Sequence, residues 1–156
     1  MYYFVVSVLL LAIEQIYFRL ADRFNIIDCP NERSSHARIT LRGGGIIFYV
    51  GALIYFMVSS FMYPWFMLGL TLIAGVSFMD DVRSVSSRVR LGVHFLAMLL
   101  MFYQWEMLEL PWWYLLVALV ACTGIINAYN FMDGINGITG GYSLVVLCGL
   151  AYVNTQ

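Results

Sequence analysis

Residues 63–90 read YPWFMLGLTLIAGVSFMDDVRSVSSRVR, an apolar run that ends in Asp80 and Asp81 and is followed by three arginines. Two ionised carboxylates side by side repel one another, and at a membrane surface neither can enter hydrocarbon without compensation. A divalent metal ion is the usual compensator when the ligands are oxygen atoms. The aspartate pair therefore predicts a metal site at the end of an apolar helix. The alternative is a solvated helix end whose arginines only set the membrane topology.

The composition indicates an integral membrane protein. Hydrophobic residues make up 62% of the 156 residues and charged residues only 11%. A soluble domain of this length could not cover so much apolar surface with so few charges. The net charge of −1 says nothing about partners, and we expect no nucleic-acid partner. Cys122 and Cys148 lie in apolar segments, where we expect them to be small buried hydrophobic residues.

Apolar windows long enough to span a bilayer, about 20 residues each, can be placed six times along the chain. They cover residues 1–21, 44–62, 63–80, 91–106, 111–128 and 138–154. The sequence therefore predicts an all-α fold, a polytopic transmembrane helix bundle of about six spans that forms a single domain over residues 1–156.

The placement of the arginines predicts the topology of these spans. All eight basic residues are arginines, five between Arg19 and Arg42 and three between Arg83 and Arg90. The first and third connections hold nearly all of them, and the second and fourth hold none. The positive-inside rule then places the first, third and fifth connections in the cytoplasm and both termini in the periplasm.

Two further polar segments lie in the predicted cytoplasmic connections. Residues 28–45 read DCPNERSSHARITLRGGG, in which arginines offer donors for phosphate oxygens and glycines let backbone N–H groups approach an anion at a helix start. An ordinary basic loop with a glycine turn is the alternative. Residues 127–141 read NAYNFMDGINGITGG, with Asn127, Asn130 and Asp133 on one helix face before Gly134 and Gly137 break the helix. Such groups at membrane depth line a cavity or bind something, unless they form a polar helix-packing seam.

Residues 28–45, the aspartate pair and residues 127–137 together resemble the polyprenyl-phosphate N-acetylhexosamine-1-phosphate transferases, often called glycosyltransferase family 4. The motifs occur in the family's order and in alternate connections. The Asp-Gly-Ile-Asn wording is most similar to the O-antigen-type branch, since other branches usually carry a second aspartate where this chain has Asn136. The resemblance covers only the N-terminal half of the family's fold. We therefore expect the chain to be the N-terminal portion of a longer fold.

The resemblance implies the transfer of a sugar-1-phosphate from a UDP-N-acetylhexosamine to a polyprenyl phosphate, typically undecaprenyl phosphate. UMP is released, and the product begins O-antigen-type envelope glycan synthesis, as part of lipopolysaccharide biosynthesis. The implied cofactor is Mg²⁺ or Mn²⁺. The implied location is the bacterial cytoplasmic (inner) membrane, with the active face in the cytoplasm. A homodimer is left open.

The family pattern also implies roles for individual residues. Asp80 and Asp81 would be catalytic and, with Asp133, would hold the metal, although which aspartate acts as a base is open. The substrate-binding residues would be Asn31, Arg33, Ser35, His36, Arg42, Gly43, Gly44, Asn127, Asn130 and Asn136.

The family's later histidine-rich loop has no counterpart here, because the only histidines are His36 and His94. We therefore expect the chain alone to be inactive or nearly so. An inactive membrane remnant and half of a transporter-like protein are the alternatives. A transporter would carry polar residues near the middle of several spans, whereas here they collect at the predicted cytoplasmic ends.

Overall fold

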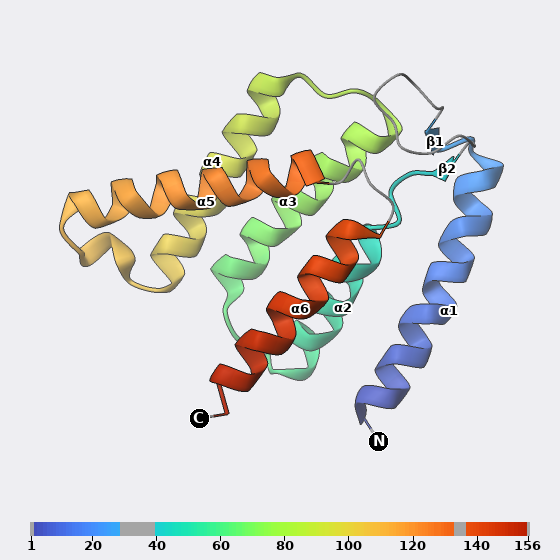
Figure 1. Ribbon diagram of the computed structural model, residues 1–156, viewed down its shortest axis with the longest axis horizontal. Coiled ribbons are helices and arrows are strands. Elements are labelled where there is room, and N and C mark those ends of the chain that lie inside the picture. Colours follow the sequence, from blue (N-terminus) through green and yellow to red (C-terminus); the bar gives the residue numbers. More distant parts are fainter. Residues whose placement is uncertain (1, 29–39, 133–136, 156) are drawn as a thin grey trace. The chain divides into compact units, whose positions relative to one another are not determined.

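A computed structural model describes residues 2–28, 40–132 and 137–155, which are mainly helical (Figure 1). The helices are α1 (Tyr2–Arg23), α2 (Ile46–Val58), α3 (Pro64–Val82), α4 (Ser87–Gln104), the 3₁₀ helix η1 (Met107–Glu109), α5 (Trp112–Met132) and α6 (Ile138–Val153). The strands β1 (Ile27–Asp28) and β2 (Thr40–Leu41) form a small two-stranded sheet. The prediction of an all-α fold is confirmed, apart from these two short strands.

The six predicted windows correspond to the six α-helices in order. The helices Tyr3–Arg23, Pro64–Val82 and Trp112–Tyr129 are long and apolar enough to cross a membrane. The helices α2 and α6 are apolar but shorter. The helix α2 ends at Val58, four residues before the predicted end at residue 62, because Ser60 and Phe61 adopt left-handed backbone conformations with φ of 58° and 62°. The orientation of the termini stays a prediction.

The chain divides into two compact units, which are described separately. The first consists of Met1–Asp28 and Leu41–Leu116, and the second of Cys29–Thr40 and Val117–Gln156. Within the first unit, α3 packs extensively along α4, and α2 contacts both α1 and α3. The prediction of a single domain remains a prediction.

The core of the first unit lies along α3 and α4. Its buried side chains include Met67 and Val76 of α3 and Met98 and Phe102 of α4. Gly69 lets the two helices approach closely, since a Cβ added there would lie only 3.0 Å from the carbonyl oxygen of Ala97. Small residues at such contacts are typical of membrane helices, whose association depends on close packing rather than on escape from water.

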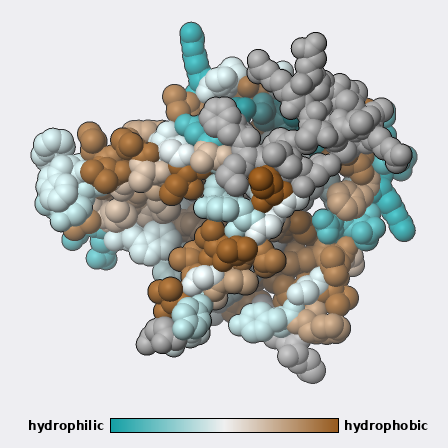
Figure 2. All heavy atoms as spheres, viewed as in Figure 1, coloured by the Kyte–Doolittle hydropathy of each residue, from teal (hydrophilic) through white to brown (hydrophobic). Residues whose placement is uncertain are grey.

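Many large hydrophobic side chains outside this core are exposed, as expected for helices that face lipid. Phe48 on α2 and Val145 on α6 are each 72% exposed, and Figure 2 shows hydrophobic residues over much of the visible surface. Cys122 is half-buried, whereas Cys148 is exposed. The expectation that Cys148 is buried is therefore wrong, because it lies on the outer face of an apolar helix.

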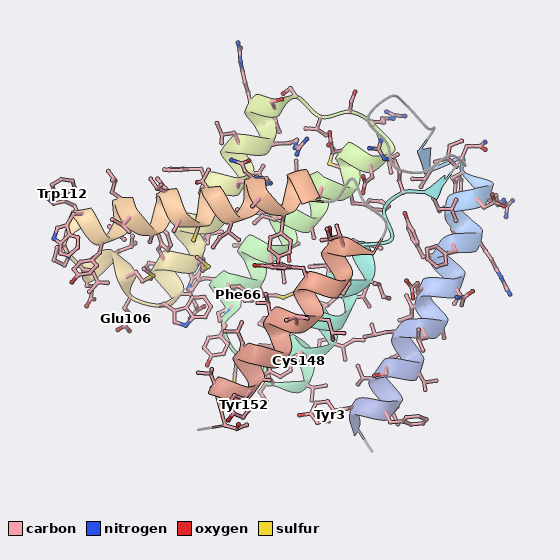
Figure 3. All side chains as sticks on the ribbon, viewed as in Figure 1. Tyr3, Phe66, Glu106, Trp112, Cys148 and Tyr152 are labelled. Atoms are coloured by element: carbon pink, nitrogen blue, oxygen red, sulfur yellow. The ribbon has the colours of Figure 1, made fainter. Side chains whose placement is uncertain are left out.

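Aromatic side chains gather where α3 begins and α4 ends. The Tyr63 and Trp105 rings stack at a centroid distance of 5.8 Å, and Phe66 meets Trp105 edge-on at 5.4 Å. The backbone N–H of Trp65 donates to Gln104 Oε1 at 3.0 Å. Figure 3 labels Phe66 at this end of the unit. These contacts fix the two helices together at the end opposite the aspartate pair.

Candidate functional site

The aspartate pair lies in the last turn of α3, with Asp80 and Asp81 preceding its final residue, Val82. The helix stops because Arg83 is extended, with φ −147° and ψ 128°, while its N–H still donates to the Met79 carbonyl. Consecutive residues of an α-helix point about 100° apart. The two carboxylates therefore face different neighbours.

Asp80 holds the connection between α3 and α4. Its Oδ1 accepts a hydrogen bond from the backbone N–H of Val85 at 2.8 Å, and its Oδ2 lies 2.9 Å from Arg90 Nη1. Both charged side chains are half-buried, with 29% of Asp80 and 33% of Arg90 exposed. Each oxygen of Asp80 thus has a close donor, and this carboxylate ties the first turn of α4 to the end of α3.

Asp81 faces the segment that precedes α2. Its Oδ1 lies 3.9 Å from Arg42 Nε, and both side chains are more exposed than the Asp80–Arg90 pair, at 36% for Asp81 and 47% for Arg42. An ion pair of this kind contributes at most about 1 kcal/mol to stability. The contact nevertheless brings together two motifs that lie far apart in the sequence.

The segment that carries Arg42 is fixed by its backbone. The Arg42 N–H donates to the Ile26 carbonyl at 3.0 Å, and the Tyr17 hydroxyl donates to the Arg42 carbonyl. Gly43 follows with φ +77°, a conformation that favours glycine. The backbone of Arg42 is therefore held by contacts from α1 and from the turn that follows it, and its guanidinium reaches Asp81 of α3.

The glycine segment does open α2, as the sequence predicts. Gly45 is the N-cap, and the N–H groups of Ile46, Ile47 and Phe48 donate to the carbonyls three residues earlier at 3.1, 3.3 and 3.1 Å. These donors are already used within the turn. An anion bound here would depend on the N–H groups of the glycines and on the Arg42 side chain.

In the second unit, α5 carries Asn127, which is exposed, and Asn130, of which only the backbone is described. The Tyr129 and Tyr142 rings join α5 to α6, edge to face at a centroid distance of 5.6 Å. Gly137 has φ +80° and caps α6, so the predicted helix break at this glycine is confirmed.

Several predicted site residues lie outside the described residues: Asn31, Arg33, Ser35, His36, Asp133 and Asn136. Within residues 2–28, 40–132 and 137–155, no group of three or more histidine, cysteine or acidic residues could hold a metal ion. The described part therefore shows the surroundings of Asp80, Asp81, Arg42, Gly43, Gly44 and Asn127, and the roles predicted for them stay predictions.

Two residues contribute to this region without having been predicted. Arg90 pairs with Asp80, although in the sequence it is one of several arginines that fit a topological role. Tyr17 reaches the Arg42 backbone from α1, a helix whose sequence is read as an ordinary apolar span. An arginine in the first turn of the helix that follows Asp80 could have suggested the pairing of Arg90 with that carboxylate. No feature of the sequence indicates a role for Tyr17.

Comparison with known proteins identifies the family. The model of glycosyl transferase family 4 matches residues 63–156, which include the aspartate pair and all of α5 and α6. The chain belongs to glycosyl transferase family 4. The resemblance read from the three motifs is thereby confirmed, and no solved structure matches this family member significantly.

Three curated relatives of this family member are named as undecaprenyl-phosphate N-acetylglucosaminyl 1-phosphate transferases. Undecaprenyl-phosphate alpha-N-acetylglucosaminyl 1-phosphate transferase of Yersinia pestis is 31% identical over 81% of the chain and 39% of its own length. The Escherichia coli K12 protein of that name is 27% identical over 86% of the chain and 41% of its own length. A probable undecaprenyl-phosphate N-acetylglucosaminyl 1-phosphate transferase of Bacillus subtilis is 28% identical over 95% of the chain and 46% of its own length. The chain thus spans less than half the length of these relatives.

Proposed function

We propose that this chain forms part of an enzyme that transfers N-acetylhexosamine-1-phosphate from a UDP-sugar to undecaprenyl phosphate. The observation that carries the proposal is the approach of Arg42 Nε to Asp81 Oδ1 at 3.9 Å. It places a phosphate-binding type of side chain beside a metal-binding type of side chain at the end of an apolar helix. The names of the relatives supply the acceptor and the transferred group.

The chemistry is a displacement at phosphorus. An oxygen of the lipid phosphate attacks the sugar-bearing phosphorus of the UDP-sugar, a new P–O bond forms, and the bond to UMP breaks. The attacking phosphate is largely ionised near neutral pH, because its second pKa is about 6. Crowded negative charge is therefore the main obstacle, and positioned arginines lower it by pairing with phosphate oxygens.

Asp81 fits a divalent cation such as Mg²⁺ or Mn²⁺, because its carboxylate offers hard oxygen donors on a partly exposed helix end. When bound, the ion would supply charge neutralisation at the phosphates. Asp80 fits less well as a ligand, since both its oxygens already accept close contacts from Val85 and Arg90. We assign Asp81 to the ion and Asp80 to the support of the helix end. We keep Asp133, which lies outside the described residues, as a metal ligand proposed from the family pattern alone.

The remaining parts of the proposal come from the arginines and the family. Arg42, Arg83, Arg88 and Arg90 lie at one end of α3 and α4, which supports a cytoplasmic active face by the positive-inside rule. We extend this to a multi-pass protein of the bacterial inner membrane that begins O-antigen-type glycan synthesis. Since the relatives are more than twice as long as the matched part, we propose that turnover also needs regions absent from these residues.

The test compares the 156-residue chain with the product of the complete reading frame in which it lies. Membranes containing each protein receive radiolabelled UDP-GlcNAc and undecaprenyl phosphate, and label in the lipid fraction is counted. We expect label with the complete product, released again as free sugar phosphate by mild acid, and little or none with the 156-residue chain. Absence of labelled lipid from the complete product, with UDP-GlcNAc and with UDP-GalNAc, would refute the proposed function.

A further inference from the structure

We infer that Tyr17 of α1 is a positioning residue that sets Arg42 against Asp81. The inference rests on the proposed function, because it assigns Tyr17 to the support of that same site. Tyr17 touches the backbone of the segment that carries Arg42 and the side of α3 that carries Asp81. It therefore acts through other residues and needs no contact with the substrate.

The first contact fixes the Arg42 backbone. The Tyr17 hydroxyl donates to the Arg42 carbonyl, across 25 residues of sequence. The next residue, Gly43, has φ +77°, and a Cβ placed there would clash with the Tyr17 hydroxyl oxygen. The hydroxyl thus fills the space that a side chain at Gly43 would need, and the glycine lets the chain pass beside it into α2.

The second contact reaches α3. The Tyr17 ring meets Phe78 edge-on at a centroid distance of 6.2 Å and an interplanar angle of 64°. Phe78 lies three residues before Asp81 on α3, a spacing that puts both residues on one helix face. The same Cβ at Gly43 would lie 3.2 Å from the Phe78 ring. Tyr17, Gly43 and Phe78 therefore form one packed contact directly beside the Arg42–Asp81 pair.

These contacts could simply stabilise the helices, and a suitable control separates the two roles. Tyr49 of α2 also uses its hydroxyl to join two elements, at 3.1 Å from Thr71 Oγ1 of α3. Tyr17→Phe and Tyr49→Phe each remove one such hydroxyl and keep the ring. A merely structural role predicts that both changes lower stability and leave UDP-GlcNAc binding unaltered.

The experiment measures the affinity for UDP-GlcNAc in the presence of Mn²⁺ on the complete purified protein, together with its thermal unfolding. We expect Tyr17→Phe to weaken UDP-GlcNAc binding about 10-fold, the loss expected when a hydrogen-bonding contact from Arg42 to a charged phosphate is weakened. Tyr49→Phe should leave the affinity unchanged. We expect Gly43→Ala to weaken binding at least as much as Tyr17→Phe, because the new methyl group displaces the hydroxyl. The double variant should bind no more weakly than Gly43→Ala alone, since both changes break one contact.

Equal UDP-GlcNAc affinity in Tyr17→Phe and wild type would overturn the inference and leave the proposed function standing. Equal weakening by Tyr49→Phe would also overturn it, because the effect would then follow from general destabilisation. A wild-type protein that neither binds UDP-GlcNAc nor labels lipid would instead overturn the proposed function, and the inference with it. If the loss of affinity in the double variant equals the product of the losses in Tyr17→Phe and Gly43→Ala, the two residues act independently. That result would reject the shared contact.

Discussion

At the C-terminal end of α3, the ionic contacts of Asp80 and of Asp81 differ in length and in exposure to solvent. On one side, Asp80 accepts contacts at 2.8 and 2.9 Å from Val85 and Arg90, in a partly buried setting. On the other side, Asp81 lies 3.9 Å from Arg42, and both side chains are more exposed. Contacts of hydrogen-bond length on both oxygens suit a carboxylate that holds structure. We propose the ligand-facing role for Asp81 because it lies beside Arg42, a side chain of the phosphate-binding type.

The difference teaches that adjacent identical residues need not share a role. Helix geometry turns the two carboxylates about 100° apart, so each meets a different element. Asp80 meets the start of α4, and Asp81 meets the segment before α2. We therefore treat the pair as one supporting residue and one ligand-facing residue.

The largest expected effect comes from Asp81→Asn in the complete protein. Loss of the negative charge at the ligand-facing position should lower kcat about 10²- to 10³-fold, because charge stabilisation at the phosphates is the main contribution. Labelled lipid formation measures it. Glu109→Gln, in η1 and away from the site, is the control and should keep wild-type turnover. Undiminished turnover in Asp81→Asn would reverse the roles assigned to the pair.

A second prediction tests the close packing of α3 on α4, on which the contact between Asp80 and Arg90 depends. Gly69→Ala should lower the free energy of unfolding by about 1–3 kcal/mol, because the new methyl group would press on the Ala97 carbonyl of α4. Thermal or denaturant unfolding in detergent measures the change. Gly75→Ala, on the same helix but with open space around it, is the control and should be neutral or stabilising. Equal losses in both variants would mean that close packing of α3 on α4 is not what Gly69 provides.

The smallest expected effect concerns the Asp80–Arg90 pair. A double-mutant cycle of Asp80→Asn and Arg90→Gln should give a coupling of about 1 kcal/mol in stability, since the pair is only partly buried. Each single variant should keep measurable turnover, because we assign neither residue to the ligand. Arg88→Gln, whose side chain is exposed on the same helix, should show no coupling to Asp80. A coupling free energy near zero would mean that the Asp80–Arg90 ion pair is no stronger than the Asp81–Arg42 ion pair.

Much of the fold follows from the sequence, because apolar length is a local signal. The six windows correspond to the six α-helices of the described residues, Gly43 and Gly45 lie at the start of α2, and Gly137 lies at a helix break, as expected. The topology inferred from the arginines stays a prediction. The early end of α2 was not predictable, since Ser60 and Phe61 adopt left-handed conformations that their types do not announce. The site was found only in part. Motifs mark Asp80, Asp81 and Arg42, but Tyr17 acts through a backbone carbonyl, which has no sequence signature.

The most direct test of the divided aspartate pair is a Mn²⁺ titration of the complete wild-type protein, Asp80→Asn and Asp81→Asn. Paramagnetic resonance counts the bound ion, and matched unfolding curves show that each variant is folded. We predict that Asp81→Asn loses Mn²⁺ binding, while Asp80→Asn retains it with a loss of about 10-fold or less. Equal losses in the two variants, or a greater loss in Asp80→Asn, would contradict the division of roles.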